Sequence, residues 1–122
     1  MTIQYMSQGD YDENENLRFG ISKHKYGEWK RLGDLKYDWS IDLINGKKYN
    51  NKKEIKYGEE GKVGDIYTCV VNRKEGSVKF IHNGKDLGVA FKDEAINEGA
   101  LYFAVSCTYE GQWVKILESS CE

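Results

Sequence analysis

The 122-residue sequence lacks proline, has only two histidines and three cysteines, and contains no long apolar run. A membrane-spanning helix needs at least about 18 consecutive apolar residues, and no stretch approaches that length. The first residues, MTIQYMSQGDYDENEN, also lack the basic-then-apolar order of a secretion signal. We therefore expect neither a membrane partner nor secretion.

The chain also lacks a large excess of charge of either sign. Eighteen basic residues face twenty acidic ones, which leaves a formal net charge of −2. Proteins that bind nucleic acid usually carry a clear basic excess, because phosphate contacts dominate the affinity. The composition therefore argues against a nucleic-acid partner.

The three cysteines are Cys69, Cys107 and Cys121. Cys69 and Cys107 fall in apolar, strand-like segments and are expected to be buried, whereas Cys121 is expected to be free in the C-terminal tail. An odd cysteine count without a secretion signal predicts a reducing, cytoplasmic environment. No C-x-x-C pair is present, so no metal site and no cofactor are expected.

Residues that could support catalysis are few. His24 and His82 are the only histidines, and both fall at loops or turns where a solvated side chain is expected. Reactive cysteines need an accessible, activated thiol, which buried Cys69 and Cys107 would not supply. The sequence therefore predicts a protein that is not an enzyme.

What the sequence does contain is a series of short β-like segments separated by Gly, Asn, Asp and Lys. Asn83-Gly84 is typical of a tight hairpin, since both central residues of a type I′ turn need positive φ. Helix is limited to one turn within residues 92–97. Such spacing indicates an all-β, antiparallel sandwich or barrel. The expected strands are 17–23, 37–43, 54–57, 66–72, 77–82, 86–91, 101–107 and 112–117, with residues 2–7 as a candidate edge strand.

Alternation along these strands assigns their faces, because neighbouring side chains point to opposite sides. Val78 and Phe80 are expected to point inward, with Ser77 and Lys79 outward. Trp39 is expected in the core. In the strand nearest the C-terminus, the inward residues are expected to be Val114 and Ile116, which leaves Trp113 on the outer face.

Several of these segments, taken in order, resemble the SPRY domain family. The central one runs from Gly64-Asp65 to F-x-x-N-G-x-x-L-G-x-A-F, which ends at Phe91. Similar strands surround it, and the resemblance covers about residues 17 to 117. The flanking segments are Leu17–Ser22 (LRFGIS), Trp39–Leu43 (WSIDL) and Leu101–Ser106 (LYFAVS).

The resemblance implies a bent, concanavalin-like sandwich of two antiparallel sheets. It also implies a non-catalytic module that binds a peptide or a surface of a partner protein through loops at one end. On this basis residues 17–117 form the domain, residues 1–16 an N-terminal segment with the candidate edge strand and a charged loop, and residues 118–122 a tail.

Within the family, the sequence most resembles the SPRY/SOCS-box adaptors. The stretch 39–53, WSIDLINGKKYNNKK, places Tyr49 at the tyrosine that contacts peptides in those proteins. By the same resemblance Tyr109 replaces a contacting tryptophan beside Thr108, and Gly33 matches a glycine near the pocket. An ordinary exposed tyrosine at a strand end remains the alternative for Tyr49.

The sequence also departs from those adaptors. It has no counterpart to their opening strand or two or to an arginine- and proline-containing loop, and no SOCS box follows residue 117. Ligase adaptor function is therefore not expected of this chain. An unpaired sheet edge would favour strand pairing with a partner or a homodimer.

Residue types alone add two further candidates. The loop 24–36 carries Trp29 and Arg31, a mixture enriched at protein interfaces. Trp29 could instead fold back over the edge of the sandwich. Two other functions stay open: a lectin-like sandwich that binds carbohydrate on Trp29 or Trp113, and a structural subunit of a larger assembly.

Overall fold

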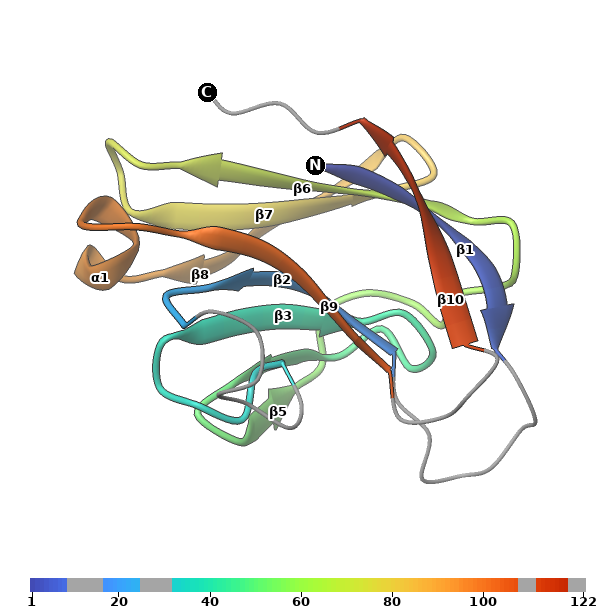
Figure 1. Ribbon diagram of the computed structural model, residues 1–122, viewed down its shortest axis with the longest axis horizontal. Helices are drawn as coiled ribbons and strands as arrows, with labels where there is room; N and C mark the ends of the chain where they lie inside the picture. Colours follow the sequence, from blue (N-terminus) through green and yellow to red (C-terminus); the bar gives the residue numbers. More distant parts are fainter. Residues whose placement is uncertain (9–16, 25–31, 108–111, 119–122) are drawn as a thin grey trace.

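Ten strands form two antiparallel sheets of five strands each, with one helical turn (Figure 1). The computed structural model describes residues 1–8, 17–24, 32–107 and 112–118. The all-β antiparallel sandwich expected from the sequence is thereby confirmed. All the expected strands are present, and their bounds differ from the expectation by a few residues at most.

Sheet A has the spatial order β10-β1-β6-β7-β8. Its strands are β10 (Gln112–Glu118), β1 (Thr2–Gln8), β6 (Ile66–Asn72), β7 (Ser77–His82) and β8 (Lys85–Lys92). The candidate edge strand near the N-terminus is thus β1, which lies between β10 and β6 rather than at an edge. Only Thr2 to Gln4 of β1 pair with β6, and Figure 1 shows β1 and β10 turning steeply away from β6 and β7.

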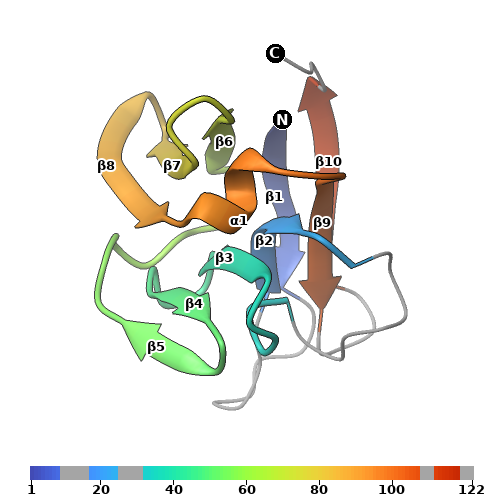
Figure 2. The same ribbon diagram turned by 90° about the vertical axis from the view of Figure 1, so that its left-hand side faces the viewer.

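Sheet B has the order β5-β4-β3-β2-β9. Its strands are β5 (Lys53–Ile55), β4 (Lys48–Asn50), β3 (Asp38–Asp42), β2 (Leu17–Ser22) and β9 (Tyr102–Cys107). Seen along the sandwich, β8 and β5 lie on one side, and β10 and β9 lie on the other (Figure 2).

The core fills the space between the sheets. Trp39, Phe19 and Phe80 are almost fully buried, and the rings of Phe19 and Phe80 meet edge to face with centroids 6.1 Å apart. Val78 is also buried, so the inward positions predicted for Val78, Phe80 and Trp39 are confirmed. Ser77, which was expected on the outward face of β7, is buried as well. Edge-to-face aromatic pairs add to the stabilisation from burial alone.

Two tight turns shape the hairpins. Asn83 and Gly84 have φ values of 50° and 82°, which confirms the turn predicted between β7 and β8. Asn51 and Lys52 also have positive φ, 54° and 64°, and they connect β4 to β5. β4 was not among the expected strands, because it is a three-residue strand followed by a turn with lysine where glycine is usual.

The only helix among the described residues is α1 (Glu94–Asn97), a single turn as expected. Asp93 caps it, because its side chain accepts a hydrogen bond from the amide of Ala95. Helices long and apolar enough to cross a membrane are absent from the described part of the chain.

Two other side-chain expectations are wrong. Ile116 was expected to point inward, but 60% of its surface is exposed. Ile116 stands opposite buried Ile3 in regular register, but β10 is the outermost strand of sheet A, and there Val114 packs against the core whereas Ile116 does not. His82 is not solvated either: its ring stacks on Tyr67 with centroids 4.3 Å apart, and its Nε2 lies 2.7 Å from Oδ2 of Asp65.

Candidate functional site

In β2 and β3 of sheet B the outer face is buried, although a sheet packed on one side normally exposes its other face. Every residue of β2 and β3 is buried, including the polar ones. The cover is the chain segment 32–36, which we call the clamp segment. The buried polar side chains of β2 and β3 are Arg18, Ser22, Asp38, Ser40 and Asp42.

Leu32 anchors the clamp segment to three strands. Its amide donates to Oγ of Ser106 on β9 at 2.9 Å. Its carbonyl accepts from Oγ of Ser40 at 2.8 Å and from Nη1 of Arg18 at 3.3 Å. The side chain of Leu32 is fully buried, so this segment is held both by hydrogen bonds and by apolar packing.

Arg18 lies at the centre of the covered face. Its guanidinium carbon is 3.7 Å from the centroid of the Tyr49 ring, and Nη1 is 3.2 Å from Oδ1 of Asp34 in the clamp segment. Nε lies 3.7 Å from Oδ2 of Asp42 and has no hydrogen-bond partner. Arg18 therefore joins the sheet, the clamp segment and Tyr49 through charge and stacking.

Tyr49 is 6% exposed, and its hydroxyl is engaged. The hydroxyl accepts from Nδ2 of Asn45 at 2.9 Å and donates to Oε2 of Glu54 at 3.2 Å. Burial is the main reason that the pKa of Tyr49 is raised above 10.0. Tyr49 is thus a neutral side chain packed under Arg18, in contrast to the exposed strand-end tyrosine considered as the alternative.

Two buried carboxyl groups have a raised pKa. Burial raises the pKa of Asp42, although the amide of Ile44 and nearby Arg18 act against it. Burial also raises the pKa of Asp38, against the hydrogen bond that Ser22 donates to Oδ1 at 2.6 Å. These carboxyl groups accept hydrogen bonds from neighbouring backbone and side chains and hold them in place.

Gly33 lies directly against Tyr49. A Cβ atom at Gly33 would lie 2.6 Å from Cβ of Tyr49 and 2.7 Å from Oγ of Ser40, closer than such atoms approach. The φ of Gly33 is +104°, a conformation that favours glycine. The structure therefore brings together two of the predicted binding residues, Gly33 and Tyr49.

The other four predicted binding residues, Trp29, Arg31, Thr108 and Tyr109, lie outside the described residues. So does the side chain of Trp113, the second aromatic considered for carbohydrate. Leu32 directly follows Arg31, and Ser106 lies two positions before Thr108; these two residues share the hydrogen bond given above. A role in partner binding stays a prediction for all six residues.

Features of a metal or nucleophilic site are not found in the described part of the chain. No three of its His, Cys, Asp and Glu residues gather closely enough to hold a metal ion. Cys69 is a free, buried thiol, as predicted, and burial raises its pKa to about 12. Such a thiol is protonated and unreactive near neutral pH.

Comparison with known proteins agrees with this fold. A sequence model of the SPRY domain matches residues 3–119, nearly the whole chain. The chain belongs to the SPRY domain family. Domains of this family are generally non-catalytic modules for protein–protein interaction.

Solved structures support the fold. The chain superimposes on a human SPRY domain with a TM-score of 0.72 at 18% identity, covering 93% of this chain and 72% of that one. It superimposes on the SPRY domain of human HERC1 with a TM-score of 0.73 at 23% identity, covering 99% of this chain and 74% of that one. At these identities the likeness concerns the fold alone.

Curated relatives match over shorter stretches. The ATP-dependent RNA helicase DDX1 of Xenopus laevis is 37% identical over 70 residues, which is 57% of this chain and 9% of the helicase. The Drosophila melanogaster Ddx1 helicase is 43% identical over 47 residues, 38% of this chain and 6% of the helicase. The chain thus matches less than a tenth of either helicase, and their activity is not transferred to it.

The sequence did not predict that Arg18, Asp34 and Ser106 take part in holding the clamp segment on sheet B. The only available signal was the polar alternation D-W-S-I-D in β3, which is also typical of a strand with one face in water. The cover over that face depends on contacts between residues far apart in the chain, such as Leu32 and Ser106, which are 74 positions apart.

Proposed function

We propose that this SPRY domain binds a segment or surface of a partner protein through the clamp segment and the loops next to it. The observation that carries the proposal is the anchoring of Leu32 to Ser106. It fixes the described residues that flank both groups of predicted contacts, Trp29 with Arg31 and Thr108 with Tyr109. Loops held by a rigid sheet are the usual binding surfaces of such domains.

Beneath this surface, the domain is stiffened by contacts that need no ligand. Arg18 stacks on Tyr49 and pairs with Asp34, while Ser40 holds Leu32. A preformed surface loses less conformational freedom on binding, which favours affinity. We further propose a reducing, cytoplasmic setting for this interaction, supported by the free thiol of Cys69.

The experiment is affinity capture from a lysate of the source cells, with three forms of the domain in parallel. These are the wild type, a Trp29→Ala/Tyr109→Ala variant, and a Val89→Ser control. Val89 is 56% exposed on the outer face of sheet A, so the control alters an apolar side chain on the opposite sheet. We expect a protein that the wild type and control retain and the double variant loses. Equal retention by all three forms would place the binding surface elsewhere.

A further inference from the structure

A second feature of sheet B, the hairpin formed by β4 and β5, concentrates positive charge. Residues 47–56, which we call the basic hairpin, read KKYNNKKEIK and contain five lysines and one glutamate. The chain as a whole has a net charge of −2, so this segment is locally opposite in sign to the rest. A local excess of one charge attracts partners of the other sign.

The single glutamate of the basic hairpin is already engaged. Glu54 lies 3.4 Å from Nζ of Lys47 and accepts from the hydroxyl of Tyr49. Lys52, Lys53 and Lys56 are exposed, and none of them forms an ion pair with another residue in the described part of the chain. These three lysines therefore face solvent without a compensating charge.

The basic hairpin also ends sheet B with an open strand edge. Among the described strands β5 pairs only with β4, and all three of its residues are exposed. Ile55 is 52% exposed and stands opposite Lys48 in the register. A row of backbone donors and acceptors beside an apolar side chain suits an added strand from another polypeptide.

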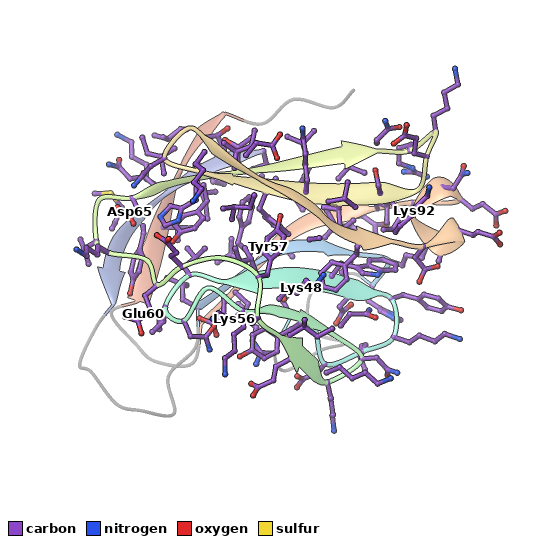
Figure 3. All side chains as sticks on the ribbon, turned by 180° about the vertical axis from the view of Figure 1, so that it is seen from behind. Lys48, Lys56, Tyr57, Glu60, Asp65 and Lys92 are labelled. Carbon is purple, nitrogen blue, oxygen red and sulfur yellow. The ribbon has the colours of Figure 1, made fainter. Side chains whose placement is uncertain are left out.

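The nearby edge of sheet A is closed by side chains. The hydroxyl of Tyr57 donates to the carbonyl of Gly88, and Nζ of Lys48 donates to the carbonyl of Ala90 at 2.6 Å. Figure 3 shows Tyr57 and Lys48 between β8 and the basic hairpin, with Lys56 close by. On this side of the sandwich, β5 is the edge that can accept a strand.

The basic hairpin is continuous with the clamp segment. The amides of Asn51 and Lys52 donate to the carbonyls of Leu35 and Gly33, both at 3.1 Å. Nδ2 of Asn50 donates to the carbonyl of Lys36 at 2.8 Å. A partner peptide bound at the clamp segment can therefore extend directly onto the lysines of the basic hairpin.

We infer that the basic hairpin binds an acidic, extended segment of the partner protein, which adds to the edge of β5. The lysines select glutamate and aspartate side chains, the backbone of β5 supplies hydrogen bonds, and Ile55 contacts an apolar residue of the added strand. This inference rests on the proposed function, from which it takes the class of partner, a protein.

A second copy of this chain fits the same edge poorly. Lysine on a short edge strand is a common device against self-association, because two such edges repel each other. Here the same lysines that exclude a second copy favour an acidic strand. Nucleic acid is disfavoured by the negative charge of the whole chain and makes no use of a strand edge.

The inference is tested with a fluorescent ten-residue peptide in which glutamates surround a central valine. Its affinity for the domain is measured by anisotropy at roughly 0.05 M and 0.5 M salt, since salt screens exposed charges. Two matched peptides separate the contributions: one has glutamine in place of glutamate, and one has alternate backbone amides methylated. A single-stranded oligonucleotide of ten nucleotides serves as the competing anion.

The protein variants are Lys53→Glu/Lys56→Glu and, as a charge-matched control, Lys74→Glu/Lys85→Glu. All four lysines are exposed; in the control pair, Lys74 lies in the turn before β7 and Lys85 is the first residue of β8. We expect the Lys53/Lys56 variant to bind the acidic peptide about tenfold more weakly or worse, with the control near wild type. Thermal melting of both variants verifies that they fold.

The glutamine and methylated peptides should both bind at least about tenfold more weakly than the acidic peptide. Equal binding of the glutamine peptide would overturn the charge selection, and equal binding of the methylated peptide would overturn strand addition. Tighter binding of the oligonucleotide that depends on Lys53 and Lys56 would make the hairpin a nucleic-acid site instead.

Failure of this inference is distinguishable from failure of the proposed function. A lysate partner that depends on Trp29 and Tyr109 but is unaffected by Lys53→Glu/Lys56→Glu supports the proposed function and contradicts the acidic segment. The opposite result is a domain that captures no partner from lysate but binds the acidic peptide through these lysines. It would support the acidic segment and contradict the proposed function.

Discussion

The guanidinium of Arg18 lies over the ring of Tyr49, with its carbon 3.7 Å from the ring centroid, and the same guanidinium reaches Asp34 in the clamp segment. This relationship couples the sheet, the segment that covers it, and the tyrosine predicted to contact a partner. A planar guanidinium can stack on the Tyr49 ring while its nitrogens contact Asp34. The ammonium group of a lysine would supply only the charge.

Replacement of Arg18 tests this coupling. Removing one member of a buried charge cluster leaves the others uncompensated, so Arg18→Ala should lower the free energy of unfolding by about 3 kcal/mol. Arg18→Lys keeps the charge but not the stacked plane, and should fall between Arg18→Ala and wild type. Urea denaturation at neutral pH measures both variants. A lysine variant as stable as wild type would show that the stacking on Tyr49 contributes nothing.

Gly33 offers a test of the contact between the clamp segment and Tyr49. Gly33→Ala introduces a methyl group where Tyr49 and Ser40 already lie, in addition to the strain of positive φ. Gly84→Ala is the matched control, since Gly84 has a φ of +82° but open space around it. Strain alone costs about 1 kcal/mol or somewhat more, so the Gly33 variant should melt at a clearly lower temperature than the Gly84 variant.

If the two glycine variants melt at the same temperature, the clamp segment can move away from Tyr49 without loss of stability. In that case Gly33 and Tyr49 would be neighbours without a stabilising contact.

Much of the fold could be predicted from sequence, because it depends on local rules. The alternation in β7 placed Val78 and Phe80 inward, and Asn83-Gly84 marked the hairpin that follows. Ile116 was misplaced, because alternation gives the side of a strand but not whether the core extends that far. It stands opposite buried Ile3 on the outermost strand of sheet A, yet it is exposed.

The candidate site was less predictable, because its arrangement is tertiary. Family resemblance placed Gly33 and Tyr49 near one surface, and the structure brings them into contact. It did not show that Tyr49 is buried beneath Arg18, which reaches it from another strand. A polar side chain on an alternating strand looks the same in sequence whether water or another segment covers it.

The thiol of Cys69 should be inert in the folded protein. Burial raises its pKa to about 12, so near neutral pH it carries a proton and is also inaccessible. Titration with Ellman's reagent should therefore count the same number of reactive thiols in native wild type and native Cys69→Ala. After unfolding, the variant should show one thiol fewer. A native difference between the two proteins would mean that the interior around Cys69 opens readily.

Asp65 should stabilise the protein in a pH-dependent way. Partial burial alone would raise its pKa, but hydrogen bonds involving Asn83, His82 and the amide of Lys62 outweigh burial and hold the pKa below 3.8. A carboxyl group with a lowered folded-state pKa stabilises the native state above the unfolded value, and this stabilisation is lost as pH falls through the folded pKa.

Asp65→Asn should therefore be less stable than wild type near pH 6, about two units above the unfolded pKa, and the difference should shrink below pH 3.8. Urea denaturation across this range measures the stability difference, with Glu75→Gln as the exposed control. A stability difference between Asp65→Asn and wild type that stays constant with pH would refute the role given to the Asp65 charge.

The central claim is that partners bind across the clamp segment. Hydrogen exchange of the domain, alone and in complex with a captured partner, tests it most directly, because it reports protection along the whole backbone. The account predicts that partner binding slows exchange in residues 32–36 and in the basic hairpin, residues 47–56. Protection confined to the outer face of sheet A, along β7 and β8, would contradict it.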